Sequence, residues 1–338
     1  FIAFGTHWAI PYALPLSIFL CLFEFMLGCH VILNIRIKLV SWLVLLMMSF
    51  FTILTFNDAI NNPVPDCGCF GDAIKLTNWE TFYKNIVLML FVIIYFTGRN
   101  IKTTFLTIKS EIIIVSSIII LFTGFEIYNY RHLPVIDFST WKPGTKLVPD
   151  NLKPLQFFVT YKNKKTGVSK EYLSSNYPYN DSIWLSEWEY TSQRVVDPNP
   201  KRTDIILEDI NGNVVTEDLL RHSDYLFIIV SYDLEQLNSF MVNKIIELHN
   251  KIAIDGHKMV FFTSNTLEII EKFKQNYQIN ENIEFFYADD TSLQAIIRCN
   301  PGLILTKEAI VIKKWHYNDF PDSEKLNKFL KKQVANQQ

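Results

Sequence analysis

The chain has 338 residues, a formal net charge of −2, 49% apolar and 20% charged residues, and five cysteines. A charge balance this close to neutral excludes a protein that binds nucleic acid through a basic surface. Five cysteines in this length are too few for a small disulfide-stapled scaffold. The charge is unevenly distributed, with 14 charged residues among the first 130 and 52 among the remaining 208. The composition therefore predicts a membrane-embedded part followed by a water-exposed part.

Four apolar runs in the first part have the composition of membrane-spanning helices. They are Trp8–Leu33, Leu39–Ile60, Phe82–Thr97 and Ile112–Tyr128. A bilayer core of about 30 Å requires roughly 20 helical residues, which the first two runs provide. The two shorter runs reach this length when the flanking tryptophan and tyrosine residues are counted as interfacial anchors. The sequence therefore predicts a bundle of four membrane-spanning helices embedded in a lipid bilayer.

The charges in the links between the runs predict the orientation. The first and last links are basic (Arg36 and Lys38; Arg99, Lys102 and Lys109), whereas the middle link is acidic (Asp58, Asp66, Asp72 and Glu80 against Lys75). The positive-inside rule places the basic links in the cytoplasm. The middle link and everything after Tyr130 then lie outside it, which predicts a multi-pass protein of the bacterial inner membrane with a large periplasmic carboxyl-terminal part. Because the chain begins with Phe1 and no cleavable signal precedes the first run, we expect a fifth span upstream.

Glu24 lies in the middle of the first run, where a carboxylate is costly. Cys21 and Gly28 share its helix face because they are three and four residues away. Two interpretations remain open for this intramembrane polar site. Glu24 is either a protonated or hydrogen-bonded residue that holds helices together, or a proton- or quinone-related site. A quinone is the only cofactor that the sequence suggests.

The acidic link contains two cysteines separated by one residue, Cys67-Gly68-Cys69. Outside the cytoplasm, cysteines meet an oxidising environment. A disulfide across so short a ring is strained, and strained, exposed disulfides exchange readily. The pair is compatible with a redox role, with a structural staple, or with half of a tetrahedral metal site. No second Cys or His pair completes such a site, so we predict no metal.

The string PDCGCFGD, followed by Thr77-Asn78-Trp79 and Lys84-Asn85 before an apolar run, resembles the MauE/DoxX-like membrane family. The Glu24-x-x-x-Gly28 pattern is also similar to that family, and the resemblance covers residues 1–130. It implies a compact helical membrane bundle linked to redox processes of the cell envelope. The resemblance therefore implies a membrane location and redox chemistry, but no particular reaction.

Residues 131–202 are rich in Pro, Asn, Tyr and Trp and predict a β-rich extension. Leu155–Tyr161 and Val168–Leu173 flank a turn at 163–167 and predict a hairpin. Ile183–Trp188 is predicted as another short strand. Its two tryptophans, Trp184 and Trp188, suit either core packing or a partner surface.

From residue 203 onward, strands alternate with helices, which predicts an α/β domain. The expected strands and hairpins are 204–208 with 214–215, 225–230, 258–263, 283–287, and 303–307 with 309–313. The expected helices are 234–254, 267–276, 293–297 and 323–333.

This order of elements resembles the TlpA-like thioredoxin fold over residues 203–333. The resemblance implies that Asn300-Pro301 is the cis-proline turn that borders the family's substrate groove. Where the family has its CxxC, this chain has 231–237, with Leu234 and Leu237 at the cysteine positions. The catalytic dithiol is therefore absent. Cys299, beside the turn, is either a lone thiol at the groove or a buried structural residue.

Together these features predict an α-helical transmembrane bundle (1–130), a periplasmic linker and β-rich extension (131–202), and a thioredoxin-like domain without CxxC (203–338). We expect an envelope redox role through Cys67 and Cys69, with the redox-inactive domain binding a client. The alternative is a non-catalytic structural or assembly subunit of a membrane or periplasmic protein complex. Both interpretations require a periplasmic or membrane protein partner, and neither involves nucleic acid. Whether the chain is an enzyme stays open.

Overall fold

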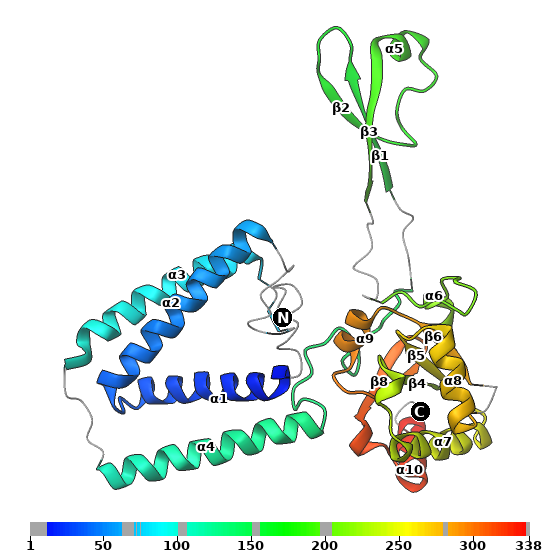
Figure 1. Ribbon diagram of the computed structural model, residues 1–338. Helices are drawn as coiled ribbons and strands as arrows, with labels where there is room; N and C mark the ends of the chain where they lie inside the picture. The colour runs from blue at the N-terminus through cyan, green and yellow to red at the C-terminus, as the bar shows by residue number, and fades with distance from the viewer. Residues whose placement is uncertain are drawn as a thin grey trace. The chain divides into compact units, whose positions relative to one another are not determined.

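The computed structural model describes residues 12–62, 71, 73–74, 76–100, 107–150, 156–196, 205–279 and 283–335. The chain divides into two compact units, Phe1–Ser139 and Thr140–Gln338. Figure 1 shows the long helices of the first unit and the sheets and shorter helices of the second.

The first unit contains four long apolar helices: α1 (Ala13–Ile32), α2 (Ile37–Asn61), α3 (Asn78–Thr97) and α4 (Ile108–Arg131). They have 20 to 25 residues and at 1.5 Å per residue are about 30 Å or longer, the thickness of a bilayer core. All four have the length and hydropathy of membrane-spanning helices. The four predicted spans are confirmed, and the protein is a multi-pass membrane protein.

Helices α2 and α3 pack against each other as an antiparallel hairpin, and α1 contacts both α2 and α4 (Figure 1). A 3₁₀ turn, η3 (Gly98–Asn100), follows α3. Arg36 Nε lies 3.6 Å from Glu111 Oε2, so the turn between α1 and α2 lies beside the first turn of α4. Most of α1 and α4 remains uncovered, with Leu27 the buried residue of α1 and none buried in α4.

The second unit includes a small antiparallel sheet in the order β2-β1-β3, made of β1 (Gln156–Asn163), β2 (Ser169–Leu173) and β3 (Trp188–Val196). This confirms the predicted hairpin. The prediction of a strand at 183–188 is wrong, because Ser182–Glu187 forms the helix α5. Asp181 Oδ1 accepts the backbone N–H groups of Ile183 and Trp184 and thereby caps that helix.

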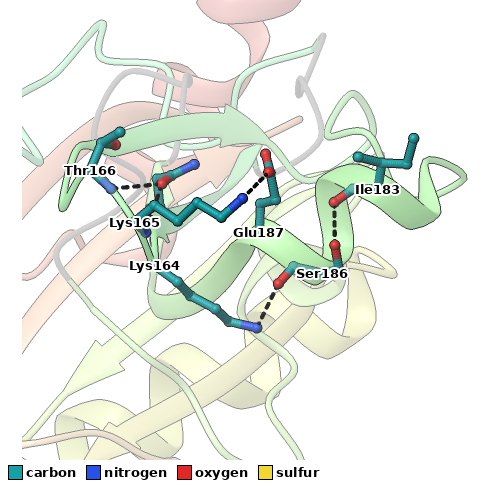
Figure 2. A network of polar contacts seen from close by, with 7 residues as sticks. Lys164, Lys165, Thr166, Ile183, Ser186 and Glu187 are labelled. Atoms are coloured by element: carbon teal, nitrogen blue, oxygen red, sulfur yellow. Dashed lines mark hydrogen bonds and ion pairs between the residues drawn. The ribbon is translucent and has the colours of Figure 1, made fainter.

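Trp184 lies at the centre of an aromatic cluster in this sheet. Its ring centroid is 4.8 Å from that of Tyr161 and 5.6 Å from those of Tyr172 and Trp188. Figure 2 shows how the β1–β2 turn is fastened to the end of α5. Lys165 Nζ lies 3.0 Å from Glu187 Oε1, and Lys164 Nζ donates to the Ser186 carbonyl at 3.0 Å. The two tryptophans therefore pack within this aromatic cluster, and both are half-buried.

The rest of the second unit is built on a five-stranded sheet in the order β6-β5-β4-β7-β8. Its strands are β4 (Leu226–Val230), β5 (Lys258–Thr263), β6 (Glu284–Tyr287), β7 (Gly302–Lys307) and β8 (Ile310–His316). Strands β4, β5 and β6 are parallel, and β7 and β8 form an antiparallel hairpin beside β4. Every residue of β4 is buried, as expected for a central strand covered on both faces.

Helices cover both faces of this sheet: α6 (Thr216–Leu220), α7 (Ser239–Ile254), α8 (Leu267–Tyr277), α9 (Asp290–Ile296) and α10 (Ser323–Ala335). One apolar core joins α7, α8 and α10 to residues such as Phe227 and Phe261 of the sheet. On the other face, Trp141 is fully buried with its ring edge-on to Phe262. The three parallel strands, the antiparallel hairpin and the helices on both faces form the predicted thioredoxin-like α/β fold.

Two local predictions differ from the structure, and one helix was not predicted. The hairpin predicted over 204–215 is reduced to an antiparallel bridge between Glu208 and Val214, and Glu208 also bridges Tyr287 of β6. Asp209 Oδ1 accepts the N–H groups of Asn211 and Asn213 and holds the tight turn between the bridged residues. The helix predicted over 234–254 is a 3₁₀ turn, η4 (Leu234–Gln236), followed by α7, since Asn238 caps the N–H of Met241. The sequence analysis did not identify α6. A further 3₁₀ turn, η5 (Tyr317–Asp319), follows β8.

Candidate functional site

The thioredoxin-like domain brings three loops together at the end of β4. Ser231, which follows β4, is fully buried, and its Oγ donates to Asn300 Oδ1 at 2.8 Å. Asn300 Nδ2 in turn donates to the carbonyl of Asp233 at 2.7 Å. The Asn300–Pro301 peptide bond is cis. Asn300 thus ties the loop after β4 to the turn before β7.

A second asparagine fixes the same loop from the end of β5. Asn265 Oδ1 accepts the Leu234 N–H at 2.8 Å and the Thr263 hydroxyl at 3.1 Å. Two side-chain amides, from two different loops, therefore hold the segment that starts at Ser231.

The segment that replaces the dithiol is apolar at both relevant positions. Leu234 and Leu237 are 2% and 4% exposed and belong to the main core of the domain. No thiol occurs in 231–237, and the two leucines contribute packing instead of reactivity. This loop has no group for thiol–disulfide exchange.

Cys299 precedes the cis turn and is 4% exposed. Burial in apolar surroundings raises the pKa of the Cys299 thiol to about 12, although the backbone N–H of Tyr317 partly offsets this by hydrogen bonding to the sulfur. Because the thiolate is the reactive form, a thiol with this pKa is neutral and unreactive near pH 7. Cys299 therefore behaves as a structural residue in the folded domain.

Cys67 and Cys69 lie outside the described residues, but both helices that the link joins are described. Helix α2 ends at Asn61, and α3 begins at Asn78 after a capping box in which Thr77 Oγ1 accepts the Glu80 N–H and Glu80 Oε2 accepts the Thr77 N–H. Asn78 Nδ2 donates to Asn62 Oδ1 at 2.7 Å. The cysteine-containing link therefore connects two helix ends that are hydrogen-bonded to each other through Asn62 and Asn78.

Asp58, which was grouped with the acidic residues of the middle link, lies within α2 and is buried. Asp58 is 6% exposed, and on α3 Thr81 and Asn85 are similarly buried. The predicted span Leu39–Ile60 already contains Asp58, whereas Asp66 and Asp72 follow it. The spacing of Asp58 from Thr55 and Asn62, three and four residues away, is the pattern that could have indicated a common helix face.

Glu24 lies on an exposed stretch of α1 together with Cys21 and Gly28. Helix α1 contacts α4 in this region, where the rings of Phe25 and Phe122 stack with centroids 4.1 Å apart. Glu24 adjoins Phe25 in the sequence, and Glu126 of α4 lies four residues after Phe122. One carboxylate oxygen of Glu126, Oε2, is buried and has no hydrogen-bond partner among the described residues. Sequence analysis did not single out Glu126. In the described parts of the chain, no three His, Cys, Asp or Glu side chains are grouped so that they could hold a metal ion.

Comparison with known families and structures supplies the context for these features. Residues 3–98 match the family of methylamine utilisation protein MauE. No curated protein sequence matches the chain at a significant level.

Several solved structures resemble the chain, with TM-scores near 0.3. A putative thioredoxin from Neisseria meningitidis is 19% identical, with a TM-score of 0.31, over 41% of this chain and 93% of its own. BsSco, a member of the Sco family of cytochrome c oxidase assembly proteins, is 12% identical, with a TM-score of 0.31, over 38% and 89%. A thiol:disulfide interchange protein from Bacteroides sp. is 14% identical, with a TM-score of 0.28, over 38% and 86%. Residues 3–98 are thus similar to methylamine utilisation protein MauE, and the strand order and helices of the second unit form a thioredoxin-like fold.

Proposed function

We propose that the protein is a redox component of the bacterial cell envelope, in which the Cys67–Cys69 pair exchanges disulfides or electrons with a client. The observation that carries this proposal is the Cys-Gly-Cys motif within the MauE-matching residues, in the link between α2 and α3. Two cysteines separated by a single glycine, outside the cytoplasm, are suited to reversible oxidation.

The charge distribution supports an inner-membrane location with the pair facing the periplasm. The α1–α2 turn carries Arg36, which pairs with Glu111 at the start of α4. At the end of α3, the Arg99 guanidinium lies 3.9 Å from the centroid of the Phe96 ring. Both basic turns belong to the end of the helices opposite the cysteine link, and basic turns favour the cytoplasm.

In this proposal the thioredoxin-like domain binds the client without reacting with it. Asn300 and Pro301 form the binding edge, and the loop at Ser231 is held by hydrogen bonds from Asn300 and Asn265. A loop fixed in this way has little conformational entropy to lose when an extended segment binds beside it.

Single-cysteine variants test the exchange directly. In Cys69→Ser, Cys67 has no partner to resolve a mixed disulfide, so we expect a covalent client adduct that dithiothreitol releases. The adduct is detected by non-reducing gels and mass spectrometry of the full chain isolated from native membranes. Cys29→Ser, in the first span, is the matched control and should trap nothing.

The absence of an adduct from both Cys67→Ser and Cys69→Ser would contradict the exchange step.

A second candidate function, a non-catalytic assembly subunit, is favoured by the burial of Leu234 and Leu237 at the dithiol positions. It predicts a stoichiometric protein partner that still co-purifies when Cys67 and Cys69 are both replaced by serine.

A further inference from the structure

The hairpin of α2 and α3 contains a buried polar seam. Its members come from both helices and are Thr55, Asp58, Asn62, Asn78, Thr81 and Asn85. All of them except Asn62, which follows the last residue of α2, are between 1% and 6% exposed. In a hairpin that crosses a bilayer, buried polar groups need partners inside the protein because lipid offers none.

Two hydrogen bonds join the helices across the seam. Asn85 Nδ2 donates to Thr55 Oγ1 at 3.1 Å, and Asn78 Nδ2 donates to Asn62 Oδ1 at 2.7 Å. On each helix the seam residues are three or four positions apart and therefore lie on one face. The two bonds thus align one polar face of α2 with one polar face of α3.

Asp58 and Thr81 lie between these two bonds, one on each helix. Because α2 and α3 are antiparallel, the α2 residue between the bonds is opposite the α3 residue between them. Asp58 is 6% exposed and Thr81 is 1% exposed. Asp58 Oδ1 is buried and has no hydrogen-bond partner among the residues that the structure describes. The middle of the seam therefore holds a carboxylate oxygen without a donor.

The hydroxyl protons of the seam are already used, whereas the hydroxyl oxygens keep acceptor capacity. Thr55 Oγ1 donates to the Phe51 carbonyl at 2.8 Å, and Thr81 Oγ1 donates to the Thr77 carbonyl at 3.0 Å. A hydroxyl has one proton to donate and two lone pairs. The seam consequently offers oxygen ligands from both helices and no hydroxyl proton for Asp58.

No described side chain supplies a counter-charge for Asp58. The charged residues of α3 at this end are Glu80, which is exposed and engaged in the helix cap, and Lys84, which is half-buried. In the part of the chain that the structure describes, neither Lys84 nor another basic residue forms an ion pair with Asp58. Buried carboxylates in proteins are paired with a basic group or bind a cation, because an isolated buried charge is costly.

We propose that the seam binds one monovalent alkali cation, with Asp58 as the charged ligand and the hydroxyl oxygens of Thr55 and Thr81 as neutral ligands. Hard cations prefer oxygen ligands. One carboxylate balances a single positive charge, whereas a divalent ion would leave an excess charge in a buried site. This ligand set differs from the clusters of His, Cys and acidic residues that hold transition metals. The bound cation fastens α2 to α3, independently of any redox role of the chain.

Equilibrium dialysis against radioactive sodium ions, with the full chain in lipid nanodiscs, tests the site directly. We expect one sodium ion to bind per wild-type chain, and we expect Asp58→Asn to lose this binding because the amide carries no charge. Glu80→Gln is the matched control, since glutamine preserves the capping box while a carboxylate at the same end is removed. Absence of binding to wild type, or equal binding to Asp58→Asn, would overturn the proposal.

A second variant tests the neutral ligands without changing the charge. Thr81→Val keeps the size of the side chain and removes its oxygen, so the affinity for sodium should fall about tenfold or more, the scale of one interaction with a charged group. Thr97→Val is the matched control on the same helix, because the Thr97 hydroxyl likewise donates to a helix carbonyl, that of Ile94, at 2.8 Å. An unchanged affinity in Thr81→Val would contradict the assignment of the ligands.

Thermal unfolding of the same samples measures the fastening of the two helices. A ligand that binds only the folded state raises stability with its concentration. The Tm of wild type should therefore rise with sodium chloride more than with choline chloride at equal ionic strength, and Asp58→Asn should respond equally to both salts. An equal response of wild type would refute the stabilising role. Displacement of radioactive sodium by calcium at far lower concentrations than by unlabelled sodium would contradict a monovalent site.

Discussion

Replacing Trp141 with alanine should destabilise the thioredoxin-like domain by about 3–5 kcal/mol, the range for removing a fully buried large aromatic side chain. Trp141 is 0% exposed, and its ring contacts Phe262 of β5 edge-on. The segment that carries it is also bonded to the β7–β8 hairpin. The N–H of Gly144 donates to the Val311 carbonyl of β8 at 2.7 Å, and the N–H of Leu147 donates to the Ala309 carbonyl in the turn before β8 at 2.7 Å. Loss of the ring therefore removes the main apolar anchor of this segment.

The buried thiol of Cys299 provides the measurement. Alkylation of Cys299 as a function of urea concentration, followed by mass spectrometry of its peptide, reports the unfolding of the domain within the full chain. Trp141→Phe is the matched control. The Trp141 Nε1–H is buried with no partner among the described residues, so phenylalanine keeps an aromatic ring and removes an unpaired donor. We expect this change to cost less than about 1.5 kcal/mol. Equal urea midpoints for Trp141→Ala and wild type would contradict the anchoring role.

Gly302→Val should also destabilise the domain, by about 3 kcal/mol, and should disturb the turn at Asn300–Pro301. Gly302 is the first residue of β7 and lies opposite both Val230 of β4 and His316 of β8. A Cβ at this position would overlap the side chain of Ile297 and would lie 3.0 Å from Cys299 Sγ. Ile297 is 1% exposed, so its side chain can move away only by shifting within the packed interior of the domain.

A double-mutant cycle separates this overlap from other effects. Ile297→Ala creates space, so Gly302→Ala should cost less in the Ile297→Ala background than in wild type. The urea midpoint of Cys299 alkylation measures each variant. Additive effects of the two substitutions would contradict the close approach of Gly302 and Ile297.

The elements predicted correctly from the sequence are those that are apolar along their whole length. The apolar runs gave four helices because lipid requires long apolar segments, and β4 was recognisable because it is buried on both faces. Ser182–Glu187 was predicted wrongly because its apolar residues also suit a short strand, and the decision depends on the cap at Asp181. The break before α7 likewise depends on one asparagine, Asn238.

The candidate site was predicted less completely than the fold. The thioredoxin-like resemblance led to Asn300 and Pro301 and to the missing dithiol, but not to the hydrogen bonds from Asn300 and Asn265. These bonds join residues that lie 31 to 69 positions apart, and no local pattern encodes such contacts. Asp58 was counted with the exposed acids of its link because burial against α3 is a tertiary property.

The redox state of Cys67 and Cys69 in wild-type cells tests the central proposal most directly. Free thiols are blocked with one maleimide, disulfides are then reduced and labelled with a second, and the peptide that contains both cysteines is analysed by mass spectrometry. The proposal predicts that the pair moves between disulfide and dithiol when cells are shifted between oxidising and reducing conditions. A pair that stays fully oxidised under both conditions, in cells where the Cys67→Ser/Cys69→Ser double variant behaves like wild type, would contradict it.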